Sequence, residues 1–153
     1  MSVREEMERL CHEGELDLAL TVGKQALRGQ PEDAMTCLTL AGICERLGRE
    51  SEAEAYYRQA IAIGLAREEW RSAQLGLGAV LRQLGRFPES RQVLEEGMKR
   101  FPGAREFGLF LALSELEAQQ PEAAIARLLT LLEQTAADPT LAAHCLALRQ
   151  QMG

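Results

Sequence analysis

Residues 34–65 read AMTCLTLAGICERLGRESEAEAYYRQAIAIGL, and this stretch decides the fold. It contains two amphipathic segments with Gly48 between them, and glycine supplies the left-handed backbone conformation that ends a helix. Ala41 lies on the first segment and Ala53 on the second, and two helices approach closely where their side chains are small. The stretch therefore predicts two antiparallel helices joined by a tight turn.

The same pattern recurs along the chain, which indicates a repeat protein. A shift of 34 residues brings Gly14 onto Gly48, and a shift of 37 brings Gly48 onto Gly85, so residues are inserted around 65–70. A further shift of 34 brings Gly85 onto Gln119. Small residues recur in matching places: Ala19, Ala53, Ser90 and Ala124 in the second helices, and Ala41, Gly78 and Ala112 in the first helices.

These units resemble tetratricopeptide repeats, and the resemblance rests on Leu40, Ala41, Leu47, Gly48, Ala53, Tyr57 and Ala60. It implies an all-α fold: a right-handed superhelical solenoid of about four helix hairpins plus a C-terminal capping helix. We expect one domain over 1–153, with units at about 1–31, 34–65, 71–102 and 105–137 and the cap at 140–151. The chain is also similar to short bacterial tetratricopeptide proteins of unassigned function that are thought to dimerise.

The helices are expected at 2–13, 16–29, 33–47, 50–64, 67–84, 87–100, 104–118, 121–136 and 140–151. The cap should cover the open side of the fourth hairpin. The first unit departs from the family pattern because Gly23 replaces the usual aromatic residue. The fourth unit lacks the turn glycine and has Gln119–Gln120–Pro121 in its place. Terminal units of solenoids are often atypical, because one of their faces meets solvent.

Charge and hydropathy exclude several classes of partner. The net charge is -6 at pH 7, and no run of Lys and Arg is dense enough to form a surface for DNA or RNA. No apolar stretch approaches the roughly 20 residues of a membrane span. The first residues are charged and do not resemble a signal peptide. We therefore expect a cytoplasmic protein that binds neither nucleic acid nor membrane.

The chemistry-bearing residues do not form a recognisable catalytic, cofactor or metal site. Cys11–His12 and His144–Cys145 are adjacent pairs near opposite ends of the chain, and a structural zinc needs four converging ligands. Cys37 lies seven residues before Cys44, which places the two thiols roughly 10 Å apart along one helix, too far for a disulfide. We predict reduced cysteines, no cofactor, no metal and no enzymatic activity.

The first helices of stacked hairpins line a concave face, so their inward positions form a candidate groove for a protein partner. By register, the groove is lined by Arg4, Glu8, Met35, Leu38, Glu45, Ser72, Leu75, Ala79, Arg82, Leu109, Leu113 and Leu116. Some tetratricopeptide proteins hold the acidic tail of heat-shock chaperones with a clamp of Lys, Asn and Arg. The matching places here are Arg4, Glu8, Thr39, Ser72 and Gly76, so no such clamp is expected.

The helix at 104–118 is apolar around most of its circumference, with Phe107 and Phe110 among its large side chains. Two interpretations are open: the cap and the helix at 67–84 bury this surface, or it meets a partner or a second copy of the chain. Trp70, in the inserted stretch, is either another interface anchor or a buried wedge.

The sequence therefore predicts a non-catalytic scaffold for protein–protein interaction with a concave, partly apolar groove. Self-association of this scaffold as a homodimer is one expected arrangement. The alternative is a small regulatory module that binds a ligand or a peptide in the groove.

Overall fold

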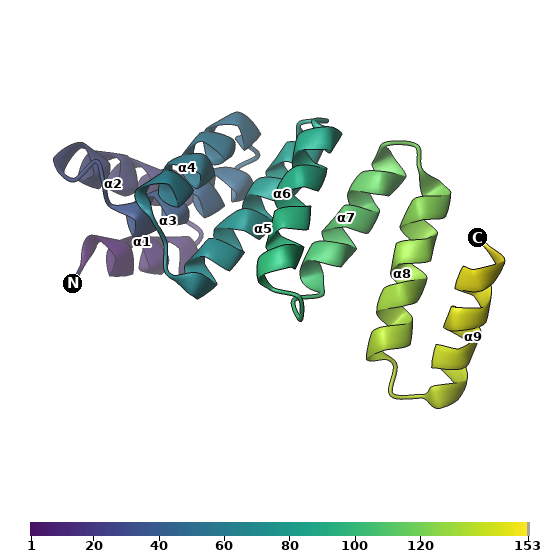
Figure 1. Cartoon of the computed structure of the whole chain (residues 1–153). Helices are drawn as coiled ribbons and strands as arrows, with labels where there is room; N and C mark the ends of the chain where they lie inside the picture. Colours follow the sequence, from purple (N-terminus) through teal and green to yellow (C-terminus); the bar gives the residue numbers. More distant parts are fainter. Residues whose placement is uncertain (153) are drawn as a thin grey trace. The chain divides into compact units, whose positions relative to one another are not determined.

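The computed structural model describes residues 1–152, and within them the chain forms nine α-helices and no strand. The helices are α1 (Val3–His12), α2 (Leu16–Gly29), α3 (Ala34–Arg46), α4 (Glu50–Ile63), α5 (Arg67–Gln83), α6 (Phe87–Arg100), α7 (Glu106–Glu117), α8 (Pro121–Thr135) and α9 (Pro139–Gln151) (Figure 1). Each expected helix is present, so the all-α helical-repeat fold is confirmed.

The chain divides into two compact units, residues 1–85 and residues 86–152, which we call the N-terminal unit and the C-terminal unit. The boundary falls in the turn between α5 and α6, inside the predicted unit 71–102. A single domain over 1–153 and a right-handed superhelical course of the whole chain stay predictions.

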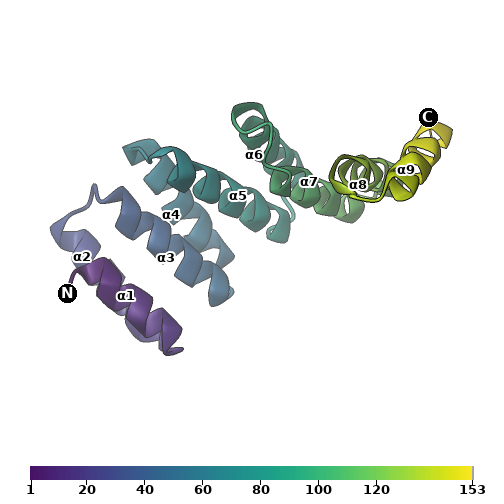
Figure 2. The ribbon, with the colours of Figure 1, turned by 90° about the horizontal axis from the view of Figure 1, so that it is seen from below.

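The N-terminal unit has two layers of helices. Helix α3 packs against both α1 and α5 to form one layer, and α2 and α4 each pack against two helices of that layer (Figures 1 and 2). Aliphatic side chains from both layers are fully or almost fully buried between them, and they form the core of the unit: Met7, Leu10, Leu20, Leu40, Ile43, Leu77, Val80 and Leu81. Burial of this apolar surface is the main force that holds the layers together.

The C-terminal unit is built as a row of helices. Helix α7 packs against α6 and α8, and α9 packs against α8 (Figure 1). Within residues 86–152, no contact joins α9 to α7. The expected cap helix is therefore present, and it covers α8 but makes no contact with α7, the other helix of the fourth hairpin.

The turn between the helices of a hairpin has the same geometry in all four repeats. Gly14, Gly48 and Gly85 have φ of +82°, +73° and +76°, and Gln119 has φ of +64°. The N–H group of the residue after the turn donates to the carbonyl five residues back: Glu15 to Leu10 at 2.9 Å, Arg49 to Cys44 at 2.8 Å and Gln120 to Glu115 at 2.8 Å. This is the hydrogen-bond pattern of a glycine helix end, and the fourth repeat keeps it without a glycine.

The recurring small residues lie where the sequence places them, in contact regions between helices. Ala19, Ala53, Ser90 and Ala124 are all buried, and so are Ala41, Gly78 and Ala112. Helix α5 has 17 residues against 13 in α3, because three residues are inserted and the loop before α5 is one residue shorter than the loop before α3. At Gly23, where other repeats carry a large side chain, an added Cβ would lie 2.5 Å from Met7 Cε and 2.6 Å from Leu40 Cδ2. Those two side chains therefore fill the space of the missing aromatic ring.

Candidate protein-binding surfaces and a polar cavity

Seven of the twelve predicted groove residues lie on α3 and α5 in the N-terminal unit, and Arg4 and Glu8 lie on α1. Met35, Leu38 and Leu75 are half-buried, whereas Ala79 is buried. The carboxylate of Glu45 is occupied, because its Oε1 accepts a hydrogen bond of 2.7 Å from the Tyr57 hydroxyl. Arg82 is half-buried near the end of α5. In this part of the groove the apolar side chains are thus only partly exposed, and the carboxylate is already hydrogen-bonded within the chain.

The other three predicted groove residues lie on α7 in the C-terminal unit and are open to solvent. Leu109, Leu113 and Leu116 keep 46%, 37% and 53% of their surface. They follow one another at helical spacing, so they form one apolar stripe, which we call the α7 stripe. Within the C-terminal unit, neither the cap nor any other helix buries them, so burial by the cap is wrong for this side of α7.

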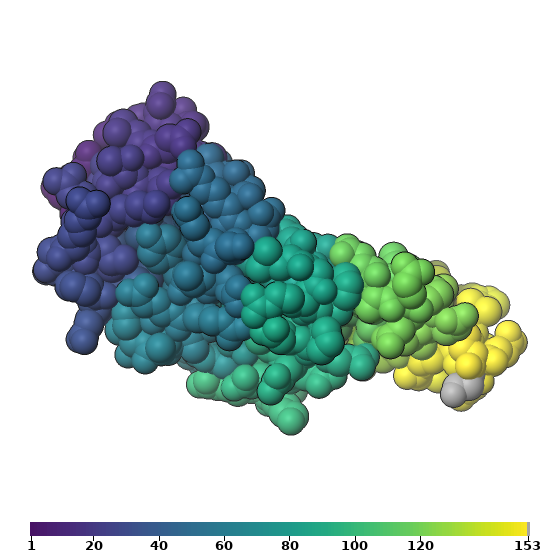
Figure 3. Space-filling view, turned by 90° about the horizontal axis from the view of Figure 1, so that it is seen from above, coloured from purple at the N-terminus to yellow at the C-terminus, as the bar shows by residue number. Residues whose placement is uncertain are grey.

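Sequence reasoning missed that α8 and α9 also expose large aliphatic side chains. On α8 these are Ile125, Leu128 and Leu132, and on α9 they are Leu141, Leu146 and Leu148. On the face shown in Figure 3, side chains of α8 (light green) and α9 (yellow) are open to solvent. Periodicity alone does not show which of these residues are exposed, because their exposure depends on how α8 and α9 pack against each other.

The aromatic residues proposed as interface anchors are mostly internal. Trp70 is buried near the start of α5, which fits the buried wedge and not the exposed anchor. Phe107 is fully buried, and its ring fills the space that a side chain at Gly97 would need. Phe110 is half-buried. As anchors for a partner, Trp70 and Phe107 would require the units to open.

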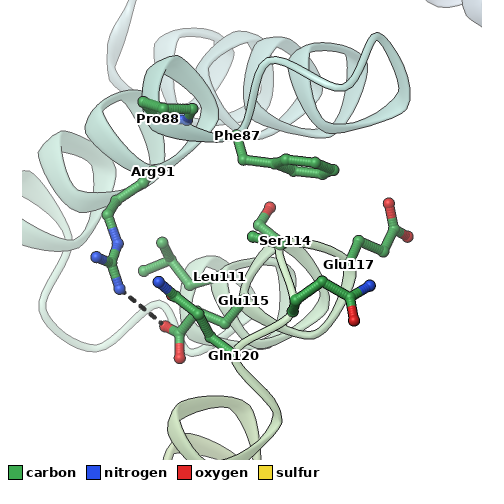
Figure 4. A pocket seen from close by; sticks show the side chains of 10 residues that line it. Phe87, Pro88, Arg91, Leu111, Ser114, Glu115, Glu117 and Gln120 are labelled. Atoms are coloured by element: carbon green, nitrogen blue, oxygen red, sulfur yellow. Dashed lines mark ion pairs between the residues drawn. The ribbon is translucent and has the colours of Figure 1, made fainter.

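A cavity of about 510 Å³ lies between the start of α6 and the end of α7. Phe87 and Pro88 of α6 face Leu111 and Ser114 of α7 across it (Figure 4). Polar groups at its edge come from α6, from α7 and from the α7–α8 turn: Arg91, Glu115, Glu117, Gln119 and Gln120. The cavity was not predicted from the sequence.

Glu115 is the most deeply buried charged residue of this cavity, with 3% of its surface exposed. Its Oε1 accepts a hydrogen bond of 2.6 Å from Arg127 Nε and lies 3.6 Å from Arg91 Nη2 (Figure 4). Nearby, the hydroxyls of Ser90 and Ser114 lie 3.2 Å apart and share a buried hydrogen bond. Two guanidinium groups therefore compensate the charge of the carboxylate.

Comparison with known protein families identifies the repeat. Residues 33–138 match the family described as Tetratrico peptide repeat. The chain belongs to the tetratricopeptide repeat family. The match begins at the N-cap of α3 and ends at the N-cap of α9. A search of curated protein sequences finds no match.

Solved structures show the same fold at low sequence identity. The MamA RS-1 ArsTM double mutant aligns with a TM-score of 0.70 and 16% identity over 98% of this chain and 92% of that one. A crystal structure of MamA aligns with a TM-score of 0.72 and 13% identity over 95% of this chain and 91% of that one. A chain of Naa15/Naa10 bound to HypK-THB aligns with a TM-score of 0.65 and 18% identity, over 98% of this chain and 22% of that one.

The tetratricopeptide core also contains thiols, and these are poor nucleophiles. Burial raises the pKa of the Cys44 thiol to about 11, and the nearby Glu52 carboxylate adds to the shift. Burial likewise raises the pKa of Cys37, with a further contribution from Asp33. Because the thiolate is the reactive form, both groups are inert near neutral pH. Among residues 1–152, no group of three His, Cys, Asp or Glu side chains is placed to hold a metal ion.

No helix within residues 1–152 has the length and apolar character needed to cross a lipid bilayer.

Proposed function

We propose that the chain is a non-catalytic, cytoplasmic scaffold for protein–protein interaction, and that a second copy of the chain docks on the α7 stripe to form a homodimer. Membership of the tetratricopeptide repeat family supports the scaffold role, since these repeats present surfaces to other proteins. The proposal rests on one observation above all: Leu109, Leu113 and Leu116 form an exposed apolar stripe. Exposed apolar patches of this kind mark interaction sites in folded proteins.

The charge distribution near the stripe supports a second copy as the occupant. On α8 and α9 the charged side chains are largely paired, with Arg127 bound to Glu115 and Arg149 bound to Glu133 at 2.7 Å. A strongly charged partner would therefore find few free opposite charges on α8 and α9. Interfaces of twofold dimers are self-complementary and more apolar at their centre than the rest of the surface.

The size of the apolar surface also supports a dimer. A standard interface buries roughly 800 Å² on each partner and contains about 20–30 residues a side. The large aliphatic side chains exposed on α8 and α9 extend the apolar surface of the C-terminal unit beyond the α7 stripe. The α7 stripe alone is too small to form a stable interface, so we expect part of α8 to contribute.

Substitution of Leu113 by Glu tests the proposal. A buried, unpaired carboxylate at the dimer centre costs several kcal/mol, so Leu113→Glu should convert a dimer into a monomer while helicity is kept. Sedimentation velocity measures the assembly and circular dichroism measures the helicity. Ile63→Glu is a matched control, since Ile63 has the same 37% exposure as Leu113 but lies on α4. A wild-type chain that sediments as a monomer, or a dimer that Leu113→Glu leaves intact, contradicts the proposal.

A further inference from the structure

The fourth repeat carries polar residues at two positions that are apolar in the second and third repeats. Ser114 and Glu115 lie five and four residues before the turn residue Gln119. The same places, counted back from Gly48 and Gly85, hold buried aliphatic or thiol side chains: Ile43, Cys44, Val80 and Leu81. A buried charge destabilises a core unless it is compensated, so packing alone does not explain Glu115.

The carboxylate of Glu115 has hydrogen-bonding capacity that the chain does not use. Arg127 donates to Oε1 at 2.6 Å, whereas Oε2 is buried and has no hydrogen-bond partner. An ionised carboxylate accepts up to about four hydrogen bonds. A buried acceptor without a donor costs free energy, and it calls for an explanation such as an incoming ligand.

The cavity beside Glu115 is suited to an aliphatic stem that ends in a cation. Its volume of about 510 Å³ lies within the usual size range of ligand pockets. The Phe87 ring, Pro88 and Leu111 supply apolar walls on both sides of the space (Figure 4). An aromatic ring also attracts a guanidinium or ammonium group placed over its face.

The charges around the cavity favour a positive ligand. Glu117 adds a second carboxylate to the lining. Arg91 is shared, because its Nε lies 3.5 Å from Glu95 Oε1 while its Nη2 reaches Glu115. Arg127 binds one oxygen of Glu115 and Arg91 is divided between Glu115 and Glu95, so the carboxylate oxygen without a donor attracts a cation and disfavours an anion.

We propose that this cavity binds a guanidinium or ammonium group on an aliphatic stem, which pairs with the Glu115 carboxylate. Either an arginine or lysine side chain of a partner protein or a small organic cation carries this chemistry. The terminal torsion of the carboxylate is soft, so a partial rotation turns Oε2 from its buried position toward the cavity at low cost. Oε1 then stays with Arg127 while Oε2 meets the ligand.

The cavity and the α7 stripe use different sides of the same helix. Leu111, Ser114 and Glu115 recur at helical spacing on one side of α7, and Leu113 lies on the other. The proposal for the cavity therefore does not rest on dimerisation. A Leu113→Glu chain should keep its affinity for a cation, which separates failure of one proposal from failure of the other.

The test is a titration of the full ¹⁵N-labelled chain, monitored by amide chemical shifts. The ligands are a capped Ala-Arg-Ala tripeptide, N-acetyl-arginine methylamide, and capped Ala-Gln-Ala and Ala-Glu-Ala as neutral and acidic controls. We expect saturable shifts at Ser114, Glu115 and Gln120 with the two arginine ligands and none with the controls. Equal affinity for the two arginine ligands indicates a free cation as the ligand, and tighter binding of the tripeptide indicates a partner protein.

Substitutions of Glu115 complete the test. Glu115→Gln keeps the size of the side chain and should weaken arginine binding at least tenfold. Glu115→Leu restores an aliphatic residue like Leu81 of the preceding repeat, so it should fold and also abolish binding. Glu122→Gln removes an exposed carboxylate of α8 outside the cavity and should leave binding unchanged. Absence of saturable shifts, equal binding of the glutamine peptide, preferential binding of the glutamate peptide, or undiminished binding by Glu115→Gln would each overturn the proposal.

Discussion

Helix α4 in the N-terminal unit and α8 in the C-terminal unit carry the same repeat pattern but differ in what covers them. Tyr57 and Leu128 occupy equivalent positions two repeats apart, and Leu94 occupies the one between. Tyr57 keeps 6% of its surface and Leu94 none, whereas Leu128 keeps 38%. The repeat pattern therefore sets which side chain points toward the next repeat, and the next repeat decides whether that side chain is buried.

The cause of the difference is the helix that follows. Tyr57 lies between α3 and α5: its hydroxyl donates to Glu45 on α3, and its ring occupies the space beside Gly76 on α5. Helix α9 packs against α8 without reaching α7, and Leu128 remains half open. An incomplete layer at the end of a solenoid leaves an apolar surface that another chain can complete.

The largest expected effect is the difference in lost stability between truncation of Tyr57 and truncation of Leu128. Tyr57→Ala removes a buried ring and its hydrogen bond, and should destabilise the N-terminal unit by about 3–5 kcal/mol. Leu128→Ala removes a half-exposed side chain and should cost about 1 kcal/mol. Urea unfolding measures the free energies, and amide hydrogen exchange assigns each loss to its unit. If Leu128→Ala lowers the free energy of unfolding as much as Tyr57→Ala does, Leu128 is covered in solution.

A smaller effect is expected at the glycine that accepts the Tyr57 ring. A Cβ at Gly76 would lie 2.5 Å from Tyr57 Oη, whose position the Glu45 hydrogen bond fixes. Gly76→Ala should therefore destabilise the unit by about 1–3 kcal/mol through overpacking. Gly42→Ala is the matched control, because Gly42 is also helical and has no atom within 4 Å of its Cβ position. It should stabilise by about 0.5–1 kcal/mol, and thermal unfolding distinguishes the opposite signs.

The smallest effect concerns the turn of the fourth repeat. Gln119 adopts φ of +64°, a conformation that costs a residue with a Cβ roughly 1–2 kcal/mol relative to glycine. Gln119→Gly should stabilise the C-terminal unit by about 0.5–1 kcal/mol, after the entropy that glycine loses on folding. Gln120→Gly is the control, since Gln120 has φ of -122° and gains nothing from glycine. A stabilisation by both substitutions, measured in urea, would contradict the strain at Gln119.

The sequence predicted much of this fold because local signals agree with the packing. Glycines at the turns, prolines at helix starts and small residues at the seams placed each helix to within one or two residues. Gln119 shows that the turn geometry persists where its sequence signal is lost, because the flanking helices impose it. The site was less predictable. Register placed Leu109, Leu113 and Leu116 on one side of a helix, but periodicity does not show that Leu128 is exposed, because that exposure depends on how α9 packs. The sequence analysis missed the cavity at Glu115. The signal was present, because alignment of the repeats sets the charged Glu115 against the apolar Cys44 and Leu81.

The buried hydroxyl pair of Ser90 and Ser114 fixes the register in which α6 packs against α7. Both side chains are buried, and each is the hydrogen-bond partner of the other at 3.2 Å. Sliding one helix along the other by a single turn would break this hydrogen bond and set the hydroxyls against hydrocarbon. Aliphatic contacts tolerate such a shift far better than this hydrogen bond does. The two hydroxyl oxygens therefore favour one register of α6 on α7 over the registers one turn away.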